Sequence, residues 1–146
     1  MKNVSGLLLA AVFAVLSLFH VYWAAGGRFG IGSGVPTVNG ARVFKPSTAG
    51  TLAVAAALFC AMLVILGQIN LLGETIPKWI FRWATFFIGV LFFLRAIGEF
   101  RLVGFFKQIR DTPFAFWDTW LFSPLCLLIA VTAFMLAYKN SADPAS

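Results

Sequence analysis

Four long apolar segments constrain the fold of this chain more than any other feature. They occupy residues 5–25, 48–70, 79–100 and 118–138, and polar or glycine-containing stretches separate them. About 20 residues of α-helix, rising about 1.5 Å each, cross the roughly 30 Å hydrocarbon core of a bilayer. The segments therefore predict an all-α integral membrane protein, a bundle of four transmembrane helices.

The composition supports this interpretation and argues against a water-soluble fold. Of the 146 residues, 61% are hydrophobic and 11% are charged, whereas about 25% are charged in an ordinary soluble domain. A soluble chain of this length has a single core, which is too small to bury so many apolar side chains. We expect one membrane domain over residues 1–146, with the lipid bilayer as its main partner.

The connections between the segments differ in character. Residues 26–47 contain several glycines and two prolines, and they predict a long loop. Residues 71–78 form a short turn, so the second and third helices should pack as an antiparallel hairpin. Residues 101–120 mix charges with aromatics, which is typical of a segment at the membrane interface. Residues 139–146 should be a loose C-terminal tail.

The charge pattern excludes some classes of function. The net charge is +6, but the eleven basic residues are scattered singly and form no stripe, so nucleic acid binding is not expected. Cys60 and Cys126 lie inside apolar segments without the spacing of metal ligands. The sequence predicts no metal site and identifies no cofactor.

Polar residues gather at one end of the predicted bundle. If the helices alternate in direction, the end of the first, the start of the second, the end of the third and the start of the fourth share one membrane face. The candidate ligand-binding residues there are His20, Tyr22, Trp23, Arg28, Arg42, Arg95, Glu99, Arg101, Arg110, Asp111 and Asp118.

Two features of this end invite a closer interpretation. Arg95 and Glu99 are four residues apart, so on a helix they share one side and can pair, either as a structural pair near the helix end or as a functional pair facing the bundle. His20 is the only histidine, and it could form an interhelical hydrogen bond or work on a ligand or proton.

Two sequence blocks resemble a known family. HVYWAAGG at residues 20–27 and LRAIGEFRLVGFFKQIRDTPFAFWDTWLFSPLCLLIA at residues 94–130 are similar to the bacterial family named domain of unknown function 3995. The resemblance implies a small four-helix protein of the bacterial cytoplasmic membrane and implies no activity. The motif-matching positions are His20, Tyr22, Trp23, Gly26, Gly27, Arg95, Glu99, Arg101, Arg110, Asp111, Pro113, Asp118 and Pro124.

The distribution of basic residues predicts the orientation. More of them fall at the polar end than at the opposite end, so the tendency of cationic loops to stay inside places the polar end in the cytoplasm and both termini outside.

Three hypotheses for function follow from these observations. The leading one is a protein that binds a small anionic ligand, a lipid headgroup or a partner at the polar end. The second is a small membrane enzyme in which His20 and either Glu99 or Asp118 transfer protons on a lipid-soluble substrate. The third is a transporter or channel component, which would act as an oligomer.

Overall fold

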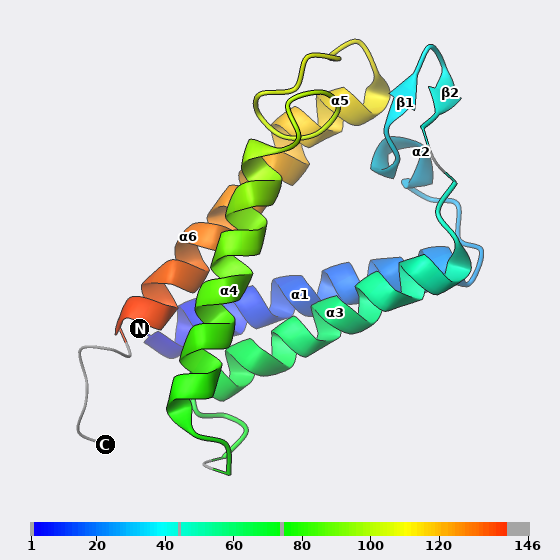
Figure 1. The fold of residues 1–146 in the computed structure, drawn as a ribbon. Coiled ribbons are helices and arrows are strands. Elements are labelled where there is room, and N and C mark those ends of the chain that lie inside the picture. The colour runs from blue at the N-terminus through cyan, green and yellow to red at the C-terminus, as the bar shows by residue number, and fades with distance from the viewer. Residues whose placement is uncertain (1, 44, 74, 140–146) are drawn as a thin grey trace.

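The computed structural model describes residues 2–43, 45–73 and 75–139, and within them it contains four long helical segments (Figure 1). All four are long and apolar enough to cross a membrane, which confirms the predicted number of transmembrane helices. They are α1 (Lys2–Ala24), α3 (Thr48–Gln68), α4 (Lys78–Ile97) and a composite helix of α5 (Pro113–Trp117), the π-helical turn η1 (Asp118–Phe122) and α6 (Ser123–Lys139).

Local signals explain where these helices begin. Ser47 caps α3, because its hydroxyl accepts a hydrogen bond from the backbone N–H of Gly50 at 3.0 Å. Thr112 caps α5 in the same way through Ala115, and Pro113 occupies the first turn, where its missing N–H has no cost. The fourth helical segment therefore starts at 113 and not at the predicted 118.

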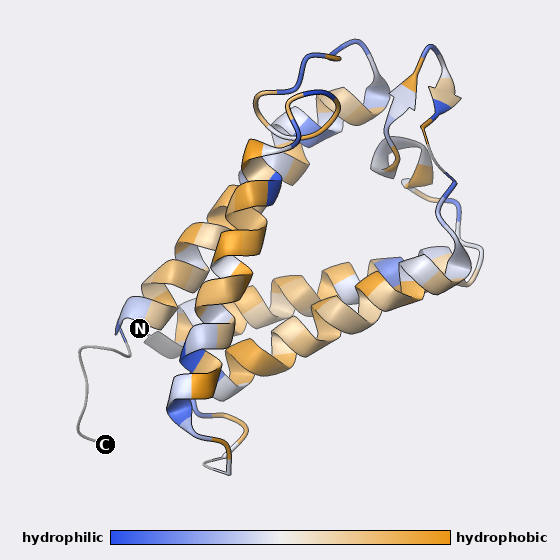
Figure 2. Cartoon of the chain, viewed as in Figure 1, coloured by the Kyte–Doolittle hydropathy of each residue, from blue (hydrophilic) through white to orange (hydrophobic). Residues whose placement is uncertain are grey.

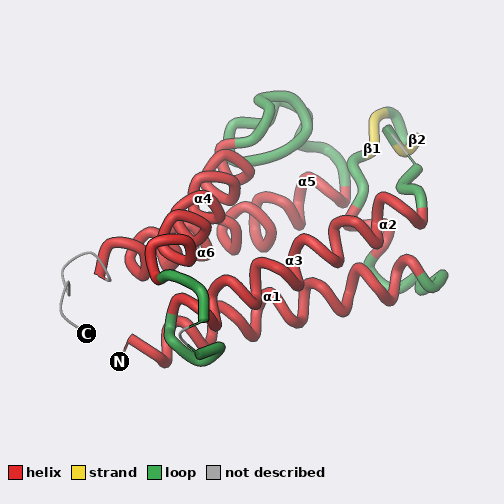
Figure 3. Tube along the Cα trace, turned by 60° about the horizontal axis from the view of Figure 1, so that its bottom comes forward, coloured by secondary structure: helices red, strands yellow, loops and turns green. Residues whose placement is uncertain are grey.

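The helices are arranged as two antiparallel pairs, α1 with α3 and α4 with α6 (Figures 1 and 3). Contacts of α3 with α4 and of α1 with α6 join the pairs near the start of α1. Phe13, Ile65 and Ile129 are almost fully buried in the core, and the Gln68 side-chain amide donates to the carbonyl of Leu136 at 3.1 Å.

Most of the apolar surface faces outward. Only 11% to 39% of each apolar window is buried inside the protein, and residues coloured as hydrophobic make up most of each long helix in Figure 2. A soluble protein rarely exposes apolar patches of this extent. Lipid must cover these surfaces, and the chain is a multi-pass membrane protein.

The connection after α1 is more structured than the predicted loop. It contains the short helix α2 (Ile31–Gly34) and the strands β1 (Thr37–Val38) and β2 (Ala41–Arg42), which pair antiparallel around Asn39 and Gly40. Both turn residues have positive φ, as a two-residue hairpin turn requires. The helix pairs diverge toward this connection, and α2 bridges them by contacting α5 (Figure 1).

Candidate functional site

The polar end lies where the two helix pairs diverge, and it contains two separate sites. We call the first the buried ion cluster, which comprises Arg95, Gly104, Lys107, Asp118 and Thr119. We call the second the α1–α3 pocket, which lies between the end of α1, the connection carrying α2 and the start of α3.

Asp118 is the centre of the buried ion cluster, and its side chain is inaccessible to solvent. Its Oδ1 accepts a hydrogen bond from Nη2 of Arg95 at 2.8 Å. Its Oδ2 accepts from the backbone N–H of Gly104 at 2.8 Å and from Nζ of Lys107 at 3.0 Å. A buried carboxylate needs such paired charges and donors to offset the loss of water.

Lys107 is equally well satisfied. Its ammonium also donates to the Gly104 carbonyl at 3.0 Å and to the Thr119 hydroxyl at 2.6 Å, so all three of its hydrogens are used. Thr119 in turn donates to the carbonyl of Ala115 at 2.9 Å. Because Asp118 and Lys107 are inaccessible and fully bonded, the buried ion cluster fixes the segment between α4 and α5 to the composite helix.

Two glycines allow this segment to fold back on α4. Gly98 ends the helix with φ of 82°, and Gly104 has φ of 90°. A Cβ at Gly98 would collide with the carbonyl oxygen of Val103, and one at Gly104 with that of Ile97. This close approach of the two backbones, fixed by a hydrogen bond from Phe105 N–H to the Ala96 carbonyl at 2.9 Å, brings Gly104 to Asp118.

The predicted pair of Arg95 and Glu99 does not form. Since α4 ends at Ile97, Glu99 lies beyond the helix, where the spacing of four residues no longer places two side chains on one face. Glu99 is exposed, and Arg95 forms its ion pair with Asp118 instead. One guanidinium nitrogen of Arg95, Nη1, is buried and has no hydrogen-bond partner among the described residues.

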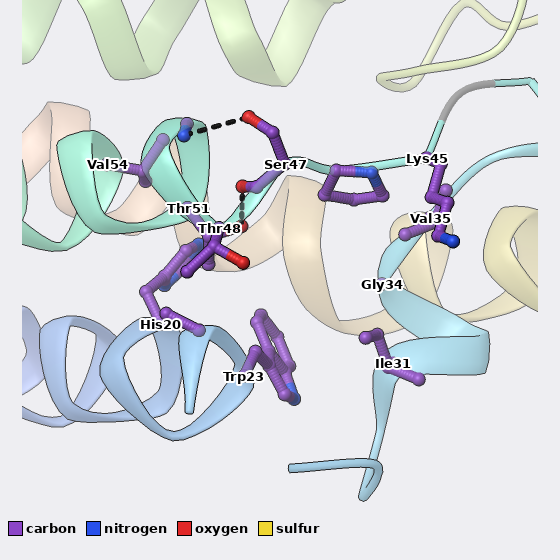
Figure 4. A pocket seen from close by; sticks show the side chains of 13 residues that line it. His20, Trp23, Ile31, Gly34, Val35, Lys45, Ser47, Thr48, Thr51 and Val54 are labelled. Carbon is purple, nitrogen blue, oxygen red and sulfur yellow. Dashed lines mark hydrogen bonds between the residues drawn. The ribbon is translucent and has the colours of Figure 1, made fainter. Parts of the chain in front are cut away.

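The α1–α3 pocket is a cavity of about 560 Å³ (Figure 4). Its walls come from three helices: His20 and Trp23 lie on α1, Ile31 on α2, and Thr48, Thr51 and Val54 on α3. The remaining lining residues are Ala24, Gly34, Val35, Lys45, Pro46, Ser47 and Gly50. One helical turn before His20 on α1, the Ser17 hydroxyl donates a hydrogen bond to the carbonyl of Ala55 at 2.8 Å. This bond holds α1 against α3.

His20 has a defined hydrogen bond within its own helix. Its Nδ1 lies 2.7 Å from the carbonyl oxygen of Leu16. A carbonyl only accepts hydrogen bonds, so Nδ1 carries a proton, and in the neutral ring Nε2 then holds a lone pair. His20 therefore contributes a hydrogen-bond acceptor to the α1–α3 pocket, and its partner is not an acidic side chain.

The block HVYWAAGG folds the chain back after α1. The indole N–H of Trp23 donates to the carbonyl of Phe29 at 2.8 Å, and the Phe29 N–H donates to the Tyr22 hydroxyl at 3.4 Å. Gly27 packs so closely on the Tyr22 ring that a Cβ would overlap it. Trp23 thus positions the wall of the α1–α3 pocket, whereas Tyr22 holds the connection and does not line the cavity.

The structure brings together only some of the predicted candidates. Arg95 and Asp118 meet in the buried ion cluster, and His20 and Trp23 line the α1–α3 pocket. Arg110 is exposed, although its Nε donates to the Lys107 carbonyl at 3.2 Å. The candidates that are exposed and line neither site are Arg28, Arg42, Glu99, Arg101 and Asp111.

Sequence reasoning missed several residues of both sites. Lys107 is one of them, because the segment 98–112 has no periodicity that would predict a buried lysine. Ser47 and Thr48 carried a usable signal, since a serine before a long apolar segment is typical of a helix start. No group of three or more His, Cys, Asp or Glu that could hold a metal ion exists within the described parts of the chain.

The fold and these two sites define a class, namely a four-helix membrane protein with an ion-paired end and an adjacent pocket. A model of the family described as "Protein of unknown function (DUF3995)" matches residues 13–133, which is most of the chain. The protein belongs to this family, as the resemblance in the sequence indicated. Neither the curated proteins nor the solved structures gave a match.

Proposed function

We propose that this protein binds an anionic ligand in the α1–α3 pocket, and that the buried ion cluster serves as the scaffold for that end of the molecule. The observation that carries the proposal is the polarity of the cavity. Among the described residues that line it, Lys45 is the one with a full charge, and none is Asp or Glu. A cation beside hydroxyl groups in a largely apolar cavity is suited to a phosphate or carboxylate group.

The contacts of Lys45 support this role. In the part of the chain that the structure describes, both ion pairs of the polar end involve Asp118, with Arg95 and Lys107 as partners. Lys45 belongs to neither pair and is exposed, so its ammonium is available to a ligand. Arg95 and Lys107, in contrast, are already engaged.

The proposal includes the location of the protein. The family resemblance supports the bacterial cytoplasmic membrane, and charge supports a cytoplasmic polar end. Seven of the eleven basic residues lie at that end, namely Arg28, Arg42, Lys45, Arg95, Arg101, Lys107 and Arg110. Basic residues concentrate on the cytoplasmic side of multi-pass proteins.

The geometry does not favour the enzyme hypothesis. Proton transfer between His20 and Glu99 or Asp118 requires hydrogen-bond reach. Asp118 gives its oxygens to Arg95, Gly104 and Lys107, and neither acid lines the pocket that His20 faces. Binding is therefore the function that we advance.

Native mass spectrometry of the protein, extracted gently from its own membrane, tests the proposal. We expect one stoichiometric anionic molecule on the wild type, and its loss in Lys45→Met. Arg101→Met is the matched control, because it removes an exposed cation that does not line the pocket. Retention of the same molecule by all three proteins, or by none, would contradict the proposal.

A further inference from the structure

The depth of the α1–α3 pocket bears on the class of ligand. Lys45 and Ser47 precede α3, whereas Val54 lies six residues inside it, about 9 Å further along the helix axis. His20 lies four residues before the end of α1, about 6 Å inside it. The cavity therefore runs from the polar segment before α3 into the span of the transmembrane helices.

The chemistry of the lining changes along this depth. The outer part offers the Lys45 ammonium and the Thr48 hydroxyl, next to the positive end of the 21-residue helix α3. The other walls are mainly apolar, with Ala24, Ile31, Val35 and Val54. Since the Trp23 N–H is engaged by Phe29, its ring adds apolar surface. A ligand that matches both parts has an anionic head and an apolar body.

His20 sets a further requirement. Its Nδ1 proton is bonded to the Leu16 carbonyl, so Nε2 of the neutral ring is free to accept a hydrogen bond from a donor on the ligand. A phosphate diester has no hydrogen-bond donor of its own, but a hydroxyl group beside the phosphate supplies one. Anion and hydroxyl together are the features of a polyol phosphate.

From these observations we infer that the α1–α3 pocket binds a membrane phospholipid whose phosphate-bearing headgroup carries a hydroxyl. Lys45 pairs with the phosphate, Nε2 of His20 accepts a hydrogen bond from the hydroxyl, and the start of the acyl chains lies against Val54 and Trp23. The inference rests on the proposed function, because it names the ligand of the same pocket.

The experiment uses the full-length protein in nanodiscs of phosphatidylcholine, to which one lipid is added at a time. The lipids are phosphatidylglycerol and phosphatidylmethanol, which have the same charge but differ in the headgroup hydroxyl. Glycerol 3-phosphate serves as the soluble probe. Lipid retention is measured by native mass spectrometry for the wild type, Lys45→Met, His20→Asn and His20→Gln, with Arg101→Met as the control.

We expect the wild type to retain phosphatidylglycerol about tenfold over phosphatidylcholine, the size of one charge-assisted hydrogen bond. Lys45→Met should abolish this preference, and Arg101→Met should keep it. In His20→Asn, the preference for phosphatidylglycerol over phosphatidylmethanol should vanish, because asparagine replaces the Nδ1 group and not Nε2. Glutamine reaches the position of Nε2 and should preserve it.

Three results would overturn the inference, and they can be told apart. Binding of glycerol 3-phosphate that depends on Lys45, without lipid retention, would exclude a lipid and leave the proposed function standing. Equal retention of both anionic lipids by the wild type would exclude the role of the hydroxyl. Binding of every probe without dependence on Lys45 would remove the inference and the proposed function together.

Discussion

The ammonium of Lys107 lies 3.0 Å from Oδ2 of Asp118, although the two side chains are only 1% and 0% exposed. They are eleven positions apart in the chain, so the contact depends on the folded segment between α4 and α5. Two cations share one carboxylate here, and removal of that carboxylate would leave both without their counter-ion. The stability of the polar end should therefore depend on Asp118.

We predict that Asp118→Asn lowers the free energy of unfolding by about 3 kcal/mol, the usual cost of removing one partner from a buried ion pair. Asparagine keeps the shape of the side chain but not its charge. Unfolding in mixed micelles with increasing SDS measures the change. Asp111→Asn removes an exposed acid from the same region and should alter stability by less than about 0.5 kcal/mol. Equal stability of the two variants would show that the buried ion cluster does not stabilise the fold.

The second prediction concerns Gly104, whose backbone has φ of 90° and lies against the Ile97 carbonyl. Alanine at this position adds the strain of a positive φ, about 1–2 kcal/mol, to a backbone collision. Gly40 has φ of 77° but open space around it, so Gly40→Ala isolates the conformational cost. In the same SDS unfolding assay, Gly104→Ala should be less stable than Gly40→Ala by about 2 kcal/mol. Comparable losses would mean that the close backbone approach is not required.

The third prediction concerns orientation. In a variant without Cys60 and Cys126, a cysteine at Asn39, in the exposed turn between β1 and β2, should react with a membrane-impermeant maleimide only in inside-out vesicles. A cysteine at the exposed Leu72, in the connection between α3 and α4, should react only in spheroplasts. The reverse pattern would place the polar end outside the cytoplasm.

Much of the fold could be predicted from the sequence, because lipid imposes simple rules on length and hydropathy. The four helices follow from the apolar segments, and the alternation of direction places His20, Arg95 and Asp118 at one end. The limits of the helices were less certain. Gly98 ends α4 before Glu99, and Thr112 with Pro113 starts the fourth segment early.

The sites could be predicted only in part. The sequence predicts Arg95 and Asp118 as candidate residues of the polar end, but their pairing depends on the folded segment 98–112, where Gly98 and Gly104 let two backbones meet. The stretch 108–112 between Lys107 and α5 is irregular, so no periodicity in the sequence places Lys107 beside Asp118. Lys45 enters the α1–α3 pocket through the path of the connection after α1, which hydrophobic periodicity does not specify.

The central claim is that His20 presents Nε2 to a ligand. Nuclear magnetic resonance of the protein labelled with ¹⁵N-histidine tests this claim most directly. The chain has one histidine, so both ring resonances belong to His20. In nanodiscs of phosphatidylcholine, at a pH where the ring is neutral, we predict a proton on Nδ1 and none on Nε2. Addition of phosphatidylglycerol should shift the Nε2 resonance more than that of Nδ1. A ring protonated on Nε2 alone, or two resonances that do not respond to the lipid, would contradict the account.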